Sequence, residues 1–446
     1  MVPLHGIGGA KDLPVPAPLA IFGGTAALVV SFVVLVLAWR TSRYDGTDRS
    51  RPLPVVLART IDSTAWKVAL RVLGLVLGGY FVWAMGLNVG TVAILRLRGG
   101  PDLVTNPVFG VFYVLLWVGI VPTSLLFGRI YRALSPVRTI FVVLSRLVGA
   151  DPSRGVLRYP AWLGCWPAAL GLFAYVWQEL VNPRSSWLAS LGLQPGVRFW
   201  VVAYALVMLL GASVFGDTWF SRADPFEVYS DLLAKMSPWA RRGDGTLVWR
   251  SPLANLATLV PRPGLVAVVA VLFGSTAFDS YKDTVRWVRV LTKLNLDVEL
   301  VNTVALLTAC AVIGLTFALA TRPNPARLLA HSVVPIIVGY MTAHYLSYFV
   351  EQGQITLLQL SDPRVNGSNL FGTANWTVDY WLIFHPSVLA SIKVLAVVLG
   401  HIVGVVSAHD RALALLPPQH QVSGQIGLLV VMVFYTLTGL YLLFGA

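Results

Sequence analysis

Ten long apolar runs constrain the fold of this chain more than any other feature of its sequence. Each run covers roughly 20 residues, the length that a helix needs to cross a hydrocarbon layer of about 30 Å. Hydrophobic residues make up 56% of the chain and charged residues 12%, which is more apolar surface than one water-soluble core can bury. The runs lie near residues 19–39, 68–89, 109–128, 161–181, 197–216, 263–279, 300–320, 328–350, 387–408 and 424–445.

The length and composition of the runs favour helices. In lipid, the backbone polar groups of a spanning segment must be satisfied within that segment, and runs this long without alternation fit helices rather than barrel strands. The sequence therefore predicts an all-α, polytopic transmembrane bundle of about ten spanning helices in the cell membrane. We expect residues 1–446 to form a single integral membrane domain.

The distribution of basic residues predicts the orientation of the bundle. Lys and Arg outnumber Asp and Glu by 33 to 20, but the basic residues cluster between the apolar runs, so we expect no nucleic-acid partner. Twenty-two of the 33 lie in or beside alternate loops, starting with the loop after the first run, and 10 lie on the other side. This bias places the first set of loops in the cytoplasm and both termini outside.

A faint internal repeat surrounds two proline-initiated helices. The stretch FGRIYRALSPVRTIF at 127–141 resembles FGDTWFSRADPFEVY at 215–229. Ser135 is expected to cap the first of these helices, and Asp224 with Glu227 to form an acidic capping box on the second. Their apolar residues recur at helical spacing, which predicts two amphipathic helices lying flat on the cytoplasmic surface.

The similarity continues into the next apolar runs. LFAYVWQE ends at Glu179 and LFGSTAFD ends at Asp279, 100 positions later, so both acids fall at corresponding outer ends of helices. We therefore expect a duplicated two-helix unit, at 109–181 and again at 197–279.

The best cluster of functional groups lies in HYLSYFVEQGQ at 344–354. His344, Tyr348 and Glu351 recur at i, i+4 and i+7, on one stripe of a helix. An ionisable side chain in a spanning helix costs about 2.5–3.5 kcal/mol on insertion scales, so each one needs a partner, a water cavity or a function.

The predicted orientation gathers several imidazoles and carboxylates on the outer side. Such groups suit a divalent transition metal, which generates hydroxide from water at neutral pH, although the sequence contains no HExxH or other tight ligand spacing. The alternative is that each is a helix-end residue facing water, with Asp279 and Asp283 paired to the arginines that follow in a surface turn. The expected metal ligands are His5, His344 and His385, and the expected catalytic acids are Glu179, Asp279 and Glu351.

Two histidines fall in AVVLGHIVGVVSAHDRAL at 396–413. His401 lies near the middle of its span beside Gly400 and Gly404, small residues that let a neighbouring helix approach closely. Its role is either an interhelical hydrogen bond or a place in a proton relay or ligand set. His409 falls at the cytoplasmic boundary, where we expect it to pair with Asp410 or with lipid headgroups.

Four segments carry a resemblance to a known family. HGIGGAKDLPVP near the N-terminus, DPFEVY, GSTAFD and GHIVGVVSAHDRAL resemble a family of actinobacterial polytopic membrane proteins commonly labelled fenitrothion hydrolase, and the resemblance extends over the whole chain. It implies hydrolysis of an aryl phosphorothioate triester, an apolar small molecule that partitions into lipid. No catalytic motif of the family transfers to particular residues.

Three classes of function fit these features. The first is metal-dependent hydrolysis of apolar organophosphate esters at the outer-face site. The second is a proton-coupled transporter or permease subunit, which a repeat and membrane-embedded polar groups such as His401 and Glu179 also suggest. The third is an assembly subunit that binds other membrane subunits as well as the lipid bilayer.

Overall fold

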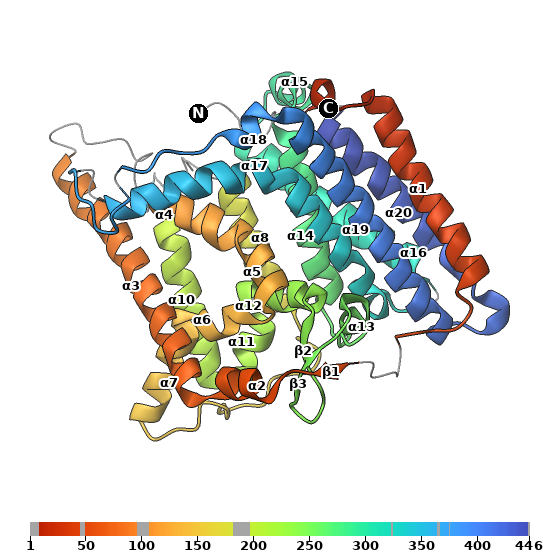
Figure 1. Cartoon of the computed structure of the whole chain (residues 1–446). Helices are drawn as coiled ribbons and strands as arrows, with labels where there is room; N and C mark the ends of the chain where they lie inside the picture. Colours follow the sequence, from red (N-terminus) through yellow and green to blue (C-terminus); the bar gives the residue numbers. More distant parts are fainter. Residues whose placement is uncertain are drawn as a thin grey trace.

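The chain folds into a bundle of long helices (Figure 1). The computed structural model describes residues 9–44, 50–95, 107–181, 197–322, 324–363, 366–373 and 375–444. Seven helices in these ranges are long and apolar enough to cross a membrane, which confirms the predicted helical architecture and fits a multi-pass membrane protein. They are α1 (Ala17–Ala38), α3 (Thr64–Leu95), α14 (Leu265–Lys282), α16 (Val298–Ala320), α17 (Val334–Ser361), α19 (Pro386–Leu415) and α20 (Ser423–Phe444).

The apolar run at 109–128 forms a broken helix. A short α4 (Pro107–Phe109) leads into the π-helix η4 (Gly110–Val118), and α5 (Ile120–Phe127) follows after a bend of 42°. At the break, Gly119 donates its N–H to the carbonyl of Val114 at 2.9 Å, the wider hydrogen bond of a π-helix. Counted as one span, this pair raises the number of candidate crossings among the described residues to eight.

Two of the ten runs form shorter helices. The helix α8 (Trp166–Leu180) begins five residues later than the apolar run, after a turn in which Gly164 has a φ of +45°. The helix α10 (Val197–Phe215) contributes the apolar stretch Phe199–Phe215.

Glycines let α17 and α19 pack with their backbones in contact. A Cβ added at Gly339 of α17 would lie 2.2 Å from the carbonyl oxygen of Ala396, and one added at Gly400 of α19 would lie 2.6 Å from that of Pro335. Gly404 faces the carbonyl of Ser332 in the same way. The order of these contacts makes the two helices antiparallel, and the small residues allow the close approach that their spacing predicts.

Replacing Gly339 with valine should destabilise the protein, because the added side chain would overlap the backbone of α19. Overpacking of this kind costs about 1–3 kcal/mol, and more where only backbone can move. Thermal unfolding in detergent would measure the loss. Gly23→Ala is the matched control, since an added Cβ there has nothing within 4 Å, and equal melting temperatures for the two variants would contradict the close packing.

The helix α1 packs against the C-terminal pair α19 and α20. Gly24 in α1 lies against Val398 of α19 and Leu440 of α20. The start of α1 and the end of α20 therefore lie at the same end of the bundle (Figure 1).

Short elements connect and cover the long helices. A three-stranded antiparallel sheet in the order β1-β3-β2 joins the segment after α1 to the hairpin after α12. The remaining elements are α2 (Val55–Asp62), α6 (Ile130–Leu134), α7 (Pro136–Leu147), α11 (Asp217–Ala223), α12 (Pro225–Leu233), α13 (Pro252–Leu256), α15 (Val285–Leu294), α18 (Trp381–Phe384), β1 (Arg51–Pro52), β2 (Trp239–Arg241), β3 (Leu247–Trp249), and the short 3-10 turns η2 (Ala10–Asp12), η5 (Ala234–Met236), η6 (Ala326–Leu328), η7 (Ala330–Val333) and η8 (Pro418–His420).

The helix α12 corrects one expectation. It was predicted to lie flat on a surface, but its residues from Pro225 to Ser230 are all buried, because α5, α8 and α11 pack around it. Only α7 has the expected two-sided character, with Phe141 and Val142 buried and Leu144 and Leu147 exposed.

The two predicted repeat units share local backbone geometry. Gly128 and Gly216 both have positive φ, +70° and +65°, and each precedes a short helix, a capping residue and a proline-initiated helix. Gly164 and Gly264, 100 positions apart, also both have positive φ and lie against each other, with the N–H of Cys165 donating to the carbonyl of Pro263 at 2.7 Å. These matches support the duplication, which stays a prediction.

Candidate functional site

A buried aspartate and histidine meet where α14 packs against α17. Asp279 lies one turn before the end of α14, and His344 lies in the first half of α17. The His344 Nε2 atom is 2.9 Å from Asp279 Oδ2, and the two residues are 6% and 7% exposed. A hydrogen bond between a carboxylate and an imidazole in a site this dry is stronger than one in water.

Two further groups bind the Asp279 carboxylate. The hydroxyl of Tyr345, the residue after His344, donates to Oδ2 at 2.7 Å. The ammonium group of Lys282, one turn along α14, lies 3.5 Å from Oδ1. Asp279 is therefore a hydrogen-bonded and charge-compensated acid, as a buried carboxylate must be.

The network continues beyond the other nitrogen of His344. Its Nδ1 atom is 3.1 Å from Ser280 Oγ, which is in turn 2.9 Å from the hydroxyl of Tyr340. The connected order is Tyr340, Ser280, His344, Asp279 and Tyr345, and we call these five residues the Asp279 network. It contains a carboxyl group, an imidazole and three hydroxyl groups, which are the side chains that can form a proton relay.

The hydroxyl hydrogen of Ser280 is coupled to the protonation state of His344. Ser280 Oγ lies 3.0 Å from the carbonyl oxygen of Thr276, which can only accept. If Ser280 donates to Thr276, its bond to Nδ1 requires a hydrogen on that nitrogen. With Nε2 also donating to the Asp279 carboxylate, His344 then carries two hydrogens and a positive charge. If Ser280 donates to Nδ1 instead, the imidazole is neutral. Rotation of the Ser280 hydroxyl therefore lets the network hold His344 in either the protonated or the neutral form.

Glu179 supplies a second acid from the corresponding helix of the other predicted repeat unit. It lies near the end of α8 and interacts electrostatically with both Asp279 and Lys282. Tyr113 of η4 and Tyr348 of α17 also interact with Glu179. The helices α8, α14, α17 and η4 thus enclose one group of acids and hydroxyls.

Asp279 does not lie in a surface turn, which was one of the two expectations for it. A salt-bridged surface turn with the following arginines was the alternative to a functional role, but Asp279 is buried and bonded to α17. Asp283 does behave as a surface residue and pairs with Lys282 at 2.8 Å. Arg286 bonds the hydroxyl of Tyr441 on α20.

Glu351 lies in α17 two turns after His344 and differs from Asp279 in its surroundings. Its side chain is 0% exposed. No described residue lies within hydrogen-bonding distance of either carboxylate oxygen. Tyr348, the third member of the predicted stripe, is half-buried.

The described residues do not bring the expected metal ligands together. His385 is exposed, stacks on Trp381 with ring centroids 4.1 Å apart, and has its Nδ1 atom 2.8 Å from the carbonyl oxygen of Trp381. His5 lies outside the described residues. Within the described ranges, no group of three or more His, Cys, Asp or Glu side chains is arranged to hold a metal ion.

His401 and His409 have different partners. His401 is 1% exposed and donates from Nδ1 to the carbonyl of Val397 at 2.8 Å, and no described residue bonds its Nε2 atom. His409 lies 2.9 Å from Gln425 through Nδ1 and 2.9 Å from the carbonyl of Trp39 through Nε2. The expectation that His409 pairs with Asp410 or headgroups is therefore wrong, and it joins α19 to α20 and α1 instead.

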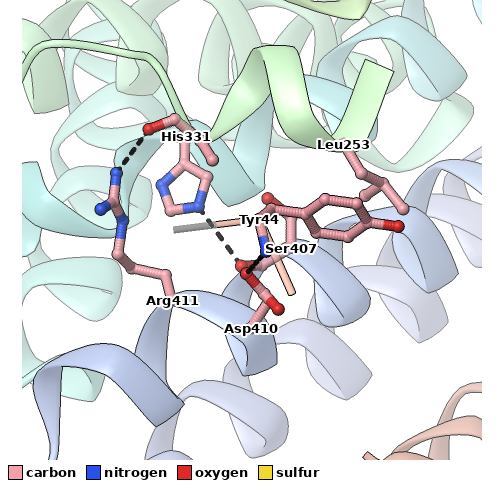
Figure 2. Close-up of a pocket in the computed structure, with 7 residues that line it drawn as sticks. Tyr44, Leu253, His331, Ser407, Asp410 and Arg411 are labelled. Carbon is pink, nitrogen blue, oxygen red and sulfur yellow. Dashed lines mark hydrogen bonds between the residues drawn. The ribbon is translucent and has the colours of Figure 1, made fainter. Parts of the chain in front are cut away.

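Asp410 holds the segment that follows α1. Its carboxylate accepts hydrogen bonds from the Trp39 indole at 3.2 Å, the Ser42 hydroxyl at 3.0 Å, and the backbone N–H groups of Arg43 and Tyr44 at 2.6 and 3.2 Å. A small hollow beside it, about large enough for one water molecule, is lined by His331, Ser407 and Arg411 among others (Figure 2). His331 Nε2 lies 3.3 Å from the Ser407 carbonyl oxygen, and the Arg411 guanidinium donates to the carbonyl of Ala257 at 2.8 Å, so we assign the hollow a structural role.

A second buried charge cluster joins the two predicted repeat units. Arg138 of α7 pairs with Glu227 of α12 and with Asp217 of α11, and Arg132 of α6 also binds Asp217 at 3.0 Å. Asp224 caps α12 as predicted, but Glu227 pairs with Arg138 rather than completing a capping box. Burial raises the pKa of Glu227 to about 7 even though Arg138 lowers it.

Sequence reasoning found some residues of the Asp279 network and of its surroundings and missed others. Asp279, His344 and Glu179 were predicted from their type and their expected side of the membrane. Tyr340 and Tyr345 were missed because tyrosines are common in membrane helices and carry no motif. Lys282 had a usable signal, since it lies three residues after Asp279 on the same helical face.

Comparison with known proteins does not assign a family or a function to this site. No family model, curated protein or solved structure matches the chain.

Proposed function

We propose that this chain is a proton-coupled transporter of the cell membrane, with Asp279 and His344 as the pair that takes up and releases the proton. The observation that carries this proposal is the buried hydrogen bond between these residues, extended on both sides by hydroxyl groups. Ionisable residues buried among membrane helices are costly, and proton relays are one of the main functions that retain them.

The proposed proton transfer uses the two states of the network. In one state His344 is an imidazolium opposite the Asp279 carboxylate, and in the other it has lost a proton and accepts from Ser280. Glu179 lies on the outer side in the proposed topology, with ten crossings and both termini outside, and is the entry acid that exchanges protons with this pair. Loss of a proton weakens the attraction between α14 and α17, which couples protonation to helix movement.

The repeated geometry supports a transporter rather than a structural subunit. Many transporters are built from internal repeats that move against each other, with the coupling site where the repeats meet. Here α8 and α14, the corresponding helices of the two units, pack against each other and each carries an acid near its end, Glu179 and Asp279.

Proton uptake into sealed vesicles tests this proposal. Proteoliposomes with an internal pH-sensitive dye would be given an inside-negative potential with potassium and valinomycin. We expect faster internal acidification than in protein-free liposomes of the same lipid. Equal rates in the two preparations would contradict proton movement by the chain.

A hydrolase is the second candidate, because Ser280, His344 and Asp279 are hydrogen-bonded in the order of a nucleophile, a base and an orienting acid. The label of the family that the sequence resembles also implies an esterase-type reaction. A fluorophosphonate probe discriminates the two candidates, since an activated serine displaces fluoride and retains the phosphonyl group. For a transporter we expect no more labelling of the wild type than of Ser280→Ala, and selective modification of Ser280 would favour the hydrolase.

A further inference from the structure

The acid that the Asp279 network leaves out is Glu351. It is 0% exposed, and neither of its oxygens has a hydrogen-bond partner among the described residues. Buried polar groups in proteins are nearly always hydrogen-bonded, so a carboxyl group with no donor at all requires an explanation.

The surroundings of Glu351 also provide no compensating charge. The π-helix η4, which packs against α17, contains only apolar residues and Tyr113. The other elements packed against α17 carry these titratable or charged groups: Glu227 and Asp231 on α12, Asp279 and Lys282 on α14, His331 on η7, and Lys393, His401, His409, Asp410 and Arg411 on α19. Within the described part of the chain, none of these groups is hydrogen-bonded to Glu351.

These two observations fix the chemical state of the side chain. A carboxylate without donors or a nearby cation is far more costly to bury than a neutral carboxylic acid. Asp279 provides the contrast within the same protein, because three groups stabilise its negative charge.

We propose that Glu351 is a second proton-binding site, which holds a proton as a neutral carboxylic acid at neutral pH. It lies two turns from His344 on the predicted stripe through Tyr348, in a helix that contacts η4. Its ligand is the proton itself, and the proposal does not rest on transport, because the acid would be protonated whether or not the chain moves a solute.

Infrared spectroscopy of the protein in detergent tests this site directly. A protonated carboxyl group has a C=O stretching band that is separate from carboxylate bands and shifts in D₂O. We expect the wild type to show this band at neutral pH, with a component that is lost in Glu351→Gln and kept in Glu299→Gln, which changes a partly exposed acid at the start of α16. Identical wild-type and Glu351→Gln spectra in this region would overturn the proposal.

The pH dependence of stability gives a second test. A buried acid that folds in the neutral form contributes stability that is fully present below the unfolded-state pKa of Glu, about 4.3, and is lost as the pH rises from there through its folded-state titration. We therefore expect Glu351→Gln and the wild type to melt together at about pH 4, and Glu351→Gln to melt at the higher temperature at about pH 8. If Glu351→Gln does not fold, absence of this band from the wild-type spectrum at neutral pH would still overturn the proposal.

Discussion

Proteoliposomes containing Asp279→Asn are expected to lose potential-driven proton uptake. Asparagine has the same shape and keeps a hydrogen bond to Tyr345, but it cannot carry the negative charge that stabilises a protonated His344. We expect the rate to fall at least about tenfold, as for loss of a positioned acid–base group. The rate would be measured with the internal dye under the valinomycin potential.

The controls separate loss of the relay from loss of the fold. Asp283→Asn changes the neighbouring exposed acid, which pairs with Lys282 at the protein surface, and should keep the wild-type rate. His344→Gln should be as defective as Asp279→Asn, whereas Tyr345→Phe should slow uptake less because it removes one hydroxyl. Wild-type flux in Asp279→Asn, with normal melting, would exclude Asp279 as the proton carrier.

Arg138→Met is expected to destabilise the protein more than any exposed charge substitution. Arg138 is 6% exposed and Glu227 is 0% exposed, so removing the guanidinium leaves a buried carboxylate without its cation. Breaking a buried pair in this way costs about 3–5 kcal/mol. Thermal unfolding in detergent would measure the difference from the wild type.

Two comparisons make this result specific. Arg154→Ala removes an exposed pair with Asp151 and should cost about 1 kcal/mol or less. Burial raises the pKa of Glu227 to about 7, so below that pH the acid can take up a proton, and the loss in Arg138→Met should be smaller at about pH 5 than at about pH 8. A loss in Arg138→Met no larger than in Arg154→Ala would show that the cluster adds little stability.

The hydrophobic pattern predicted where the helices are better than it predicted which elements pack against them. The apolar runs gave the long helices because length and composition alone decide whether a segment can cross lipid. The pattern of Pro225–Leu233 was equally compatible with an interface at the membrane surface or with burial, and the structure buries it. Periodicity locates an apolar face but does not identify the element that packs on it.

The same limit applies to the candidate site. Residue type and expected depth brought Asp279, Glu179 and His344 into one group, and the structure joins Asp279 to His344. Sequence could not show that His385 stacks on Trp381 instead, because that depends on the path of a loop. Nor could it distinguish the bonded carboxylate of Asp279 from the unbonded one of Glu351, since both are acids in apolar helices.

The hydrogen bond between Trp39 and Asp410 has a consequence for biosynthesis. These residues are 371 positions apart, so α1 is synthesised long before Asp410, whose carboxylate binds the segment at the end of α1. The first helix must wait in the bilayer, or in the insertion machinery, until α19 and α20 arrive beside it. Chains that stop short of α19 should therefore leave α1 undocked and exposed to membrane quality-control proteases.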